Sequence, residues 1–133
     1  MKFAKAVFWI AAIYGFVAVP PLYFLESRIG QMSPPAITHP EYFYGFAGLA
    51  LAWQLLFVLI ARDPQRYRPA MLPAIVEKLG FGLASLALYL HGRLSLQGWL
   101  VSTVDLLFAV LFALAFVRVG RQLPVRAEDG LRS

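Results

Sequence analysis

Four long apolar runs constrain this sequence more than any other feature. They cover roughly residues 3–25, 42–61, 70–90 and 98–117, and each is close to the ~20 residues that a helix needs to cross a bilayer. Inside lipid, the backbone N–H and C=O groups of such a run must be hydrogen-bonded within the chain, which a helix achieves. We therefore predict an all-α integral membrane protein, an antiparallel four-helix bundle in one domain (residues 1–133) whose first partner is the lipid bilayer.

A soluble four-helix bundle is the alternative fold, and it requires a polar stripe along each helix. Between Phe43 and Ile60 the one strongly polar side chain is Gln54, so this run has no such stripe. Composition agrees with a membrane protein, because 60% of the residues are hydrophobic and only 14% are charged, whereas soluble domains have about 25% charged residues. We exclude the soluble bundle on these grounds.

A short basic segment between the second and third runs predicts the orientation. It holds Arg62, Arg66 and Arg68, and Lys or Arg residues beside a membrane span mark its cytoplasmic side. The N-terminus, this segment and residues 118–133 carry nine Lys and Arg residues, whereas the two opposite loops carry only Arg28 and Arg93. We predict a bacterial inner (plasma) membrane protein with both termini in the cytoplasm (N-in/C-in) and residues 118–133 as a cytoplasmic tail.

The net charge of +5 comes from basic residues that flank the apolar runs and do not form a nucleic-acid-binding face. We therefore expect no nucleic-acid partner. The three basic-segment arginines are candidates for contact with anionic lipid, which is worth about 1 kcal/mol per residue near the membrane surface. A homo-oligomer and a membrane partner protein stay open as partners.

Three ionisable residues lie within the apolar runs: Glu77, Lys78 and Asp105. Because a charge at the centre of a bilayer costs about 2.5–3.5 kcal/mol on insertion scales, each is a candidate functional residue. Helical side chains lean toward the N-terminus of their helix, so we expect Glu77 and Lys78 to lean toward the cytoplasm and Lys78 to snorkel. As neighbours in sequence, these two are not expected to form an ion pair with each other.

Asp105 is the strongest of the three candidates, because its side chain is too short to reach water. We expect it to face the bundle interior, within hydrogen-bonding reach of Tyr14, Gln54 or Lys78. Depth along the helices places Lys78 about 9 Å away from it, so Tyr14 is the favoured partner. A structural role, joining the fourth span to its neighbours, and a role in proton chemistry both remain open.

The loop before the second run holds Glu26, His39 and Glu41, which are common ligand types for divalent cations. Thr38 and Glu41 have the spacing of a capping box, and Glu26 has Arg28 as a nearby partner, so each carboxylate has a role that needs no metal. We predict outer-mouth polar residues here and no metal site.

No cofactor is expected. The chain has no cysteine, which excludes thiol catalysis and cysteine-ligated metals. It also has no glycine-rich phosphate loop, nucleophile elbow or HExxH helix, so no catalytic residue is predicted.

Part of the chain resembles the DoxX-like group of small bacterial four-span membrane proteins. The similar features are Tyr42-Phe-Tyr-Gly-Phe-Ala-Gly48, the Arg62-Asp-Pro hinge, Glu77-Lys-Leu79 and Asp105-Leu-Leu-Phe108. This resemblance covers the second to fourth spans and implies a four-span architecture without assigning residue roles. A second likeness, in residue types only, is to the sterol-isomerase-like membrane fold, which places carboxylates and histidine in a lipid-facing cavity.

Three function classes follow from these patterns. The leading one is a non-enzymatic accessory or assembly component of a membrane system. The second is a small oligomeric transporter that uses a membrane-embedded carboxylate. The third is a lipid-active, isomerase-like enzyme, which requires Asp105 and a second acid such as Glu77 to face one apolar cavity.

Overall fold

The computed structural model describes residues 1–124, and these residues are helical with short connections. In chain order the elements are α1 (Lys2–Ala18), the 3-10 helix η1 (Pro20–Phe24), α2 (Glu26–Met32), α3 (Pro40–Arg62), the 3-10 helix η2 (Arg68–Ala70), α4 (Met71–Leu90) and α5 (Leu96–Gln122). Four of them, each with its adjoining short helix where there is one, are long and apolar enough to cross a membrane. The predicted all-α fold with four candidate spans is confirmed.

The sequence explains where most helices begin and end. Pro20 and Pro21 stop the regular hydrogen bonding of α1, which gives way to η1 at this point. Ser95 caps α5, because its hydroxyl accepts a hydrogen bond from the backbone N–H of Gly98 at 3.1 Å. The turn before α5 uses Gly92 at a φ of +70°, a backbone conformation that glycine adopts without steric cost.

The structure differs from three local expectations. The connection after the first span contains α2, whose seven residues make about two helical turns. The capping box of Thr38 and Glu41 does not form, since His39 is the N-cap residue of α3 and no side chain caps it. Helix α5 continues to Gln122, past the expected end of the fourth span near residue 117. Only part of the expected tail therefore lies beyond the helix, and residues 125–133 of that tail lie outside the described residues.

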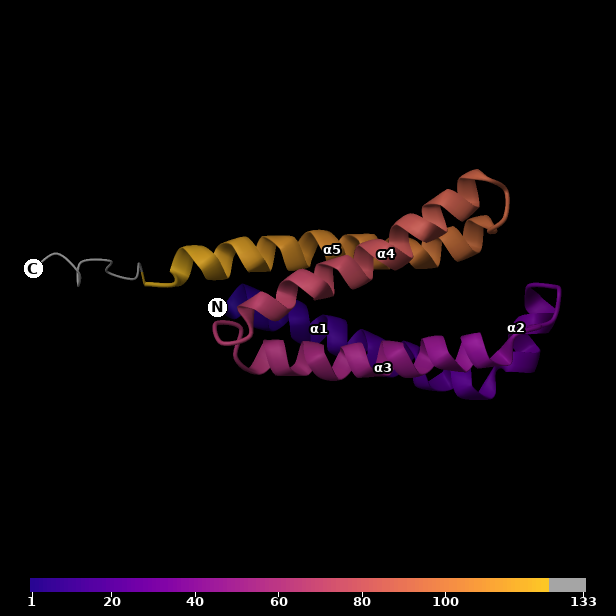
Figure 1. Cartoon of the computed structure of the whole chain (residues 1–133), viewed down its shortest axis with the longest axis horizontal. Helices are drawn as coiled ribbons and strands as arrows, with labels where there is room; N and C mark the ends of the chain where they lie inside the picture. The colour runs from indigo at the N-terminus through magenta and orange to yellow at the C-terminus, as the bar shows by residue number, and fades with distance from the viewer. Residues whose placement is uncertain (125–133) are drawn as a thin grey trace, which may run out of the picture.

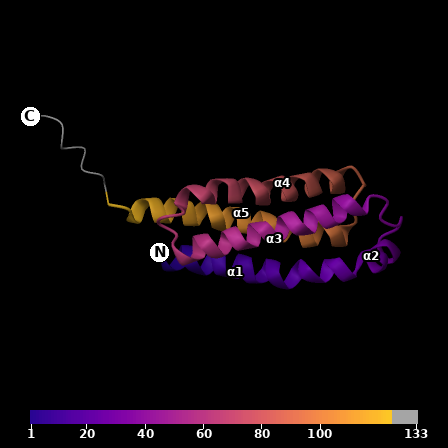
Figure 2. The same ribbon diagram turned by 60° about the horizontal axis from the view of Figure 1, so that its bottom comes forward.

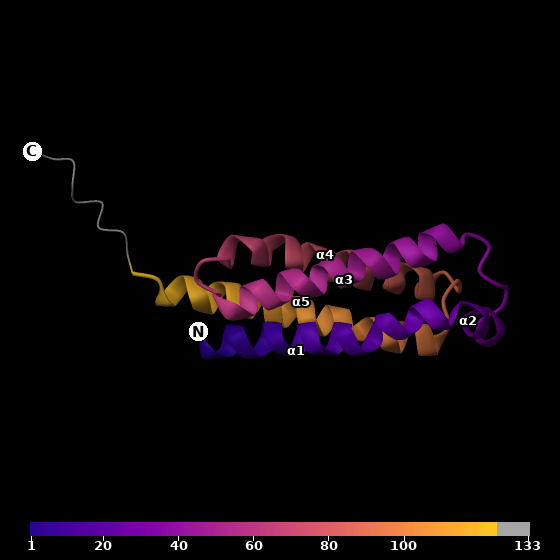
Figure 3. The ribbon, with the colours of Figure 1, turned by 90° about the horizontal axis from the view of Figure 1, so that it is seen from below.

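The long helices form two antiparallel hairpins (Figure 1). One hairpin pairs α1 with α3 and the other pairs α4 with α5, while α1 also packs along α5 and the contacts between α3 and α4 are few. The turned views show the four helices running along the same long axis (Figure 2, Figure 3). The hairpins lie close together at the end that holds the N-terminus, here called the termini end, and spread apart toward the α2 end (Figure 1).

Aromatic side chains form the core near the termini end. The rings of Phe8 and Phe112 stack at 4.2 Å, and Phe57 packs edge-on against Phe112 at 5.1 Å. All three side chains are fully buried. Because this cluster joins α1, α3 and α5, it holds both hairpins together at one end and leaves their other halves free to separate.

Candidate functional site

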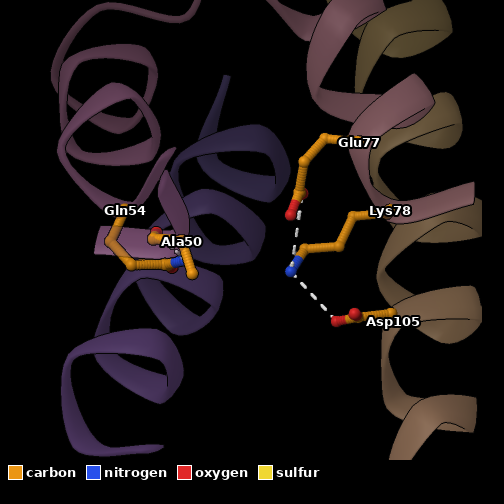
Figure 4. Close-up of polar contacts among 5 residues, drawn as sticks. All are labelled: Ala50, Gln54, Glu77, Lys78 and Asp105. Atoms are coloured by element: carbon orange, nitrogen blue, oxygen red, sulfur yellow. Dashed lines mark hydrogen bonds and ion pairs between the residues drawn. The ribbon is translucent and has the colours of Figure 1, made fainter. Parts of the chain in front are cut away.

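Glu77 and Lys78 of α4 and Asp105 of α5 lie together on the side of their hairpin that faces α1 and α3 (Figure 4). The ammonium group of Lys78 lies 3.0 Å from Oδ1 of Asp105 and 3.7 Å from Oε2 of Glu77. The side chains of Lys78, Asp105 and Glu77 are only 7%, 17% and 20% exposed. We call these three residues the charged triad.

The triad confirms one expectation about Asp105 and corrects another. Its carboxylate does accept a hydrogen bond from another span, but the donor is Lys78 and not Tyr14. The expected partner, Tyr14, is wrong because the long side chain of Lys78 spans much of the offset between the backbone levels of Lys78 and Asp105. The ring of Tyr14 packs instead against Phe108, with ring centroids 5.8 Å apart.

The expected snorkelling of Lys78 is also wrong, because its side chain is buried. It forms the ion pair with Glu77 that neighbouring positions disfavour, since both stems are long enough to curl toward one point. The ammonium group further lies 5.4 Å from the ring of Phe57 and 5.8 Å from the ring of Phe108. Two carboxylates and two ring faces thus replace the water that Lys78 has lost.

Gln54 faces the triad from α3 (Figure 4). Its side chain is 3% exposed, and its amide nitrogen donates to the carbonyl of Ala50 at 2.9 Å. It lies directly over Gly15 of α1, where an added Cβ would clash with Cδ of Gln54. Glycine at position 15 therefore makes room for the amide of Gln54. The sequence shows Gln54 only as the one strongly polar residue of its span and does not predict this contact.

Two oxygen atoms at this level have no hydrogen-bond partner within the described part of the chain. They are Oε1 of Gln54 and Oε2 of Glu77, both of them buried. A buried acceptor without a donor costs about 1–3 kcal/mol, so each of these oxygens favours a donor that the described residues do not supply.

A cavity of about 230 Å³ separates the two hairpins at this level. Its polar lining consists of the charged triad, Gln54 and Tyr14. The apolar lining comes from all four long helices and η1: Gly15, Ala18, Val19, Leu22, Phe46, Ala50, Phe81 and Val101. The cavity thus has the mostly apolar wall with a few convergent polar groups that is typical of small-molecule sites.

The polar and apolar walls lie at different depths. On α5, Val101 precedes Asp105 by four residues, which places it about 6 Å closer to the α2 end. On α3, Phe46 precedes Gln54 by eight residues, or about 12 Å in the same direction. The cavity therefore has a polar floor toward the termini end and apolar walls toward the α2 end.

The loop residues at the α2 end do not join this site. The hydroxyl of Tyr44 donates to Glu26 at 2.7 Å, and the expected pairing of Glu26 with Arg28 is not among the ion pairs of residues 1–124. His39 and Glu41 form a solvent-exposed pair at 3.3 Å. Among the residues that the structure describes, no three His, Cys, Asp or Glu side chains gather as a metal site would require.

The three arginines of the basic segment differ in their contacts. Arg68 donates to the backbone carbonyl of Phe116 at 3.0 Å and lies over its ring at 3.9 Å, so it joins α5 to the segment before α4. Arg62 and Arg66 are exposed at the termini end. Contact with anionic lipid stays a prediction for these two arginines.

Comparison of the chain with protein families, with curated proteins and with solved structures finds no match. The likeness to the DoxX-like group stays an expectation. The function must be inferred from the cavity and its lining.

Proposed function

We propose that this chain is a small non-enzymatic membrane component that binds a membrane-soluble ligand between its two hairpins. One observation carries the proposal: the charged triad and Gln54 form the floor of a cavity whose walls are otherwise mainly apolar. Charged groups are expensive at this depth and are placed there mainly for function. A ligand with one polar end and an apolar body fits both parts of the cavity.

The bilayer is the source of the ligand under this proposal. The helices α3 and α4 share few contacts, and the rings of Phe46 and Phe81 bridge them at 5.7 Å while both remain partly exposed. A molecule dissolved in the hydrocarbon region can enter between these rings after a change of side-chain rotamer. A phospholipid fits poorly, because its head group stays at the membrane surface whereas the polar floor lies near the middle of the span.

The second candidate is a lipid-active, isomerase-like enzyme, and one observation favours it. Glu77 and Asp105 converge on the same cavity, as an enzyme that moves a proton with two carboxylates requires. Binding is the better conclusion, because Lys78 contacts both carboxylates and holds them as an ion-paired group.

The proposed orientation has both termini in the cytoplasm of a bacterial cell. Arg62, Arg66 and Arg118 all lie at the termini end with the N-terminal lysines, which supports this orientation through the positive-inside rule. A second copy or another membrane protein remains part of the proposal as a partner.

Photolabelling tests the binding site. The probe is dodecanol with a diazirine on its sixth carbon, added to the full chain in nanodiscs. We expect labelling of Ala18, Val19 and Val101, because a hydroxyl on the polar floor places the sixth carbon beside them. The matched control is Ala50→Leu, which fills the cavity and should remove this labelling. Equal labelling of lipid-facing residues such as Leu83 and Leu107, unchanged by Ala50→Leu, would contradict the proposal.

A further inference from the structure

The charges that line the cavity do not balance. Ionised together, Glu77 and Asp105 carry two negative charges, and Lys78 is the one positively charged residue in the cavity lining, as residues 1–124 form it. One negative charge remains uncompensated in a region where charge is costly. We infer that the ligand of this cavity is a lipophilic ammonium cation, which takes the place of a proton on the pair of carboxylates. This inference rests on the proposed function and names the chemistry of its ligand.

The unpaired hydrogen-bonding groups at the cavity are acceptors, so a ligand that donates hydrogen bonds is favoured. Oε2 of Glu77 and Oε1 of Gln54 have no hydrogen-bond donor among the described residues, although Oε2 of Glu77 keeps its 3.7 Å ion pair with Lys78. The amide nitrogen of Gln54 already donates to Ala50. An ammonium group has up to three N–H donors and no acceptor. It therefore suits a lining whose unpaired groups are acceptors, whereas a ligand that only accepts hydrogen bonds does not.

The rest of the lining favours an organic cation over a metal ion. The aromatic side chains of Phe46, Phe81 and Tyr14 line the cavity, and a cation within about 6 Å of a ring centroid is attracted to the ring face. Among the described residues no three His, Cys, Asp or Glu side chains gather as a metal site would require, and both carboxylates of the lining already contact Lys78. The apolar walls beyond the polar floor match the hydrocarbon part of an amine.

The competing cation is a proton. The groups that face Glu77 are Lys78 on its own helix, Asp105 on α5, Tyr14 on α1 and Gln54 on α3. When a proton balances the triad, the arriving ammonium ion releases it, so that the total charge of the cavity is the same before and after binding. Binding of the ammonium ion is therefore linked to release of up to one proton, and it weakens as the pH falls.

Titration calorimetry tests this inference on the full chain in phosphatidylcholine nanodiscs. The two probes are dodecylamine, which is cationic at neutral pH, and dodecanol, which is neutral. Runs in buffers with different heats of ionisation give the number of protons released, and empty nanodiscs correct for partition into lipid. We expect dodecylamine to bind with proton release and dodecanol to bind about tenfold more weakly without it, the difference typical of one hydrogen bond to a charged group.

Glu77→Gln keeps the size of the side chain and should abolish proton release and lower dodecylamine affinity about tenfold. The matched control is Glu41→Gln, the same change at an exposed position, which should alter neither quantity. If Glu77→Gln does not fold, the comparison of the two probes on the unaltered chain decides alone. Equal binding of both probes without proton release would overturn this inference and leave the proposed function standing. Binding of neither probe would overturn both.

Discussion

Lys78 determines the chemistry of the centre of this molecule. It contacts both intramembrane carboxylates and two aromatic rings. A buried charge of this kind is stable only while its partners remain, because an isolated ion in a low-dielectric region loses several kcal/mol of solvation. The free energy of unfolding that is lost when one member of the triad is removed therefore depends on which charged groups remain without a partner.

Asp105→Leu should lower the free energy of unfolding by about 3–5 kcal/mol, because it leaves Lys78 with one weak ion pair. Asp105→Asn should cost less, since its amide oxygen still accepts from Lys78. Adding Lys78→Met to Asp105→Leu should recover much of the loss, because the ammonium group that lost its hydrogen-bonded partner is gone and Glu77 can be neutralised by a proton. Denaturant unfolding in detergent measures all three. A double variant no more stable than Asp105→Leu would show that the Lys78–Asp105 pair is not what holds this site.

The residues of the site could be predicted from sequence, but their contacts could not. Glu77, Lys78 and Asp105 stand out because charged residues are rare within apolar spans. Their pairing depends on side-chain reach and on how closely α4 lies against α5, and neither appears in the order of residues. Gln54 gave a weaker signal, because one amide within an apolar run also fits a purely structural hydrogen bond.

Small residues position the helices, and their spacing alone did not identify which ones matter. Gly80 and Ala84 on the third span are small residues four positions apart, the spacing that lets a neighbouring helix approach closely. Both residues are nevertheless exposed. Gly82, two residues further along α4, is the one in contact, since an added Cβ would clash with Cδ2 of Leu106. The rotation of a helix about its own axis is set by its neighbours, so sequence alone did not separate these two glycines.

Alanine substitution separates these two glycines. Gly82→Ala should lower the free energy of unfolding by about 1–3 kcal/mol, because the methyl group overpacks the contact with α5. Gly80→Ala is the matched control on the same helix, and with nothing within 4 Å of its added Cβ it should raise stability by up to about 1 kcal/mol through helix propensity. Equal effects in thermal unfolding would contradict the packing of α4 against α5.

At the scale of the whole molecule, the hairpin arrangement explains why a cavity exists. The aromatic core joins α1, α3 and α5 near the termini end, while the few contacts between α3 and α4 leave the hairpins separate farther along. Four apolar runs predicted the spans, because the bilayer fixes their length. They did not predict the spreading of the hairpins, which depends on where large side chains meet.

Cysteine labelling tests the threading of the whole chain. Gln65 lies between α3 and α4 at the termini end, whereas Gln31 lies in α2; both are exposed. With an impermeant thiol reagent on intact cells, a cysteine at position 31 should react and one at position 65 should react only after lysis. The chain has no native cysteine to interfere. The reverse pattern would overturn the proposed orientation.

The most direct test of the charged triad is to measure which groups surround the Lys78 ammonium group when the chain is in a bilayer. The chain has only three lysines, Lys2, Lys5 and Lys78, so solid-state NMR with ¹⁵N-labelled lysine and ¹³C-labelled carboxylates can isolate its signal. With a nitrogen-to-oxygen distance of 3.0 Å, we predict dipolar coupling to a carboxyl carbon within about 4 Å, and a changed chemical shift when dodecylamine is added. A Lys78 signal without carboxylate coupling, unchanged by dodecylamine, would contradict the charged triad and the cavity built on it.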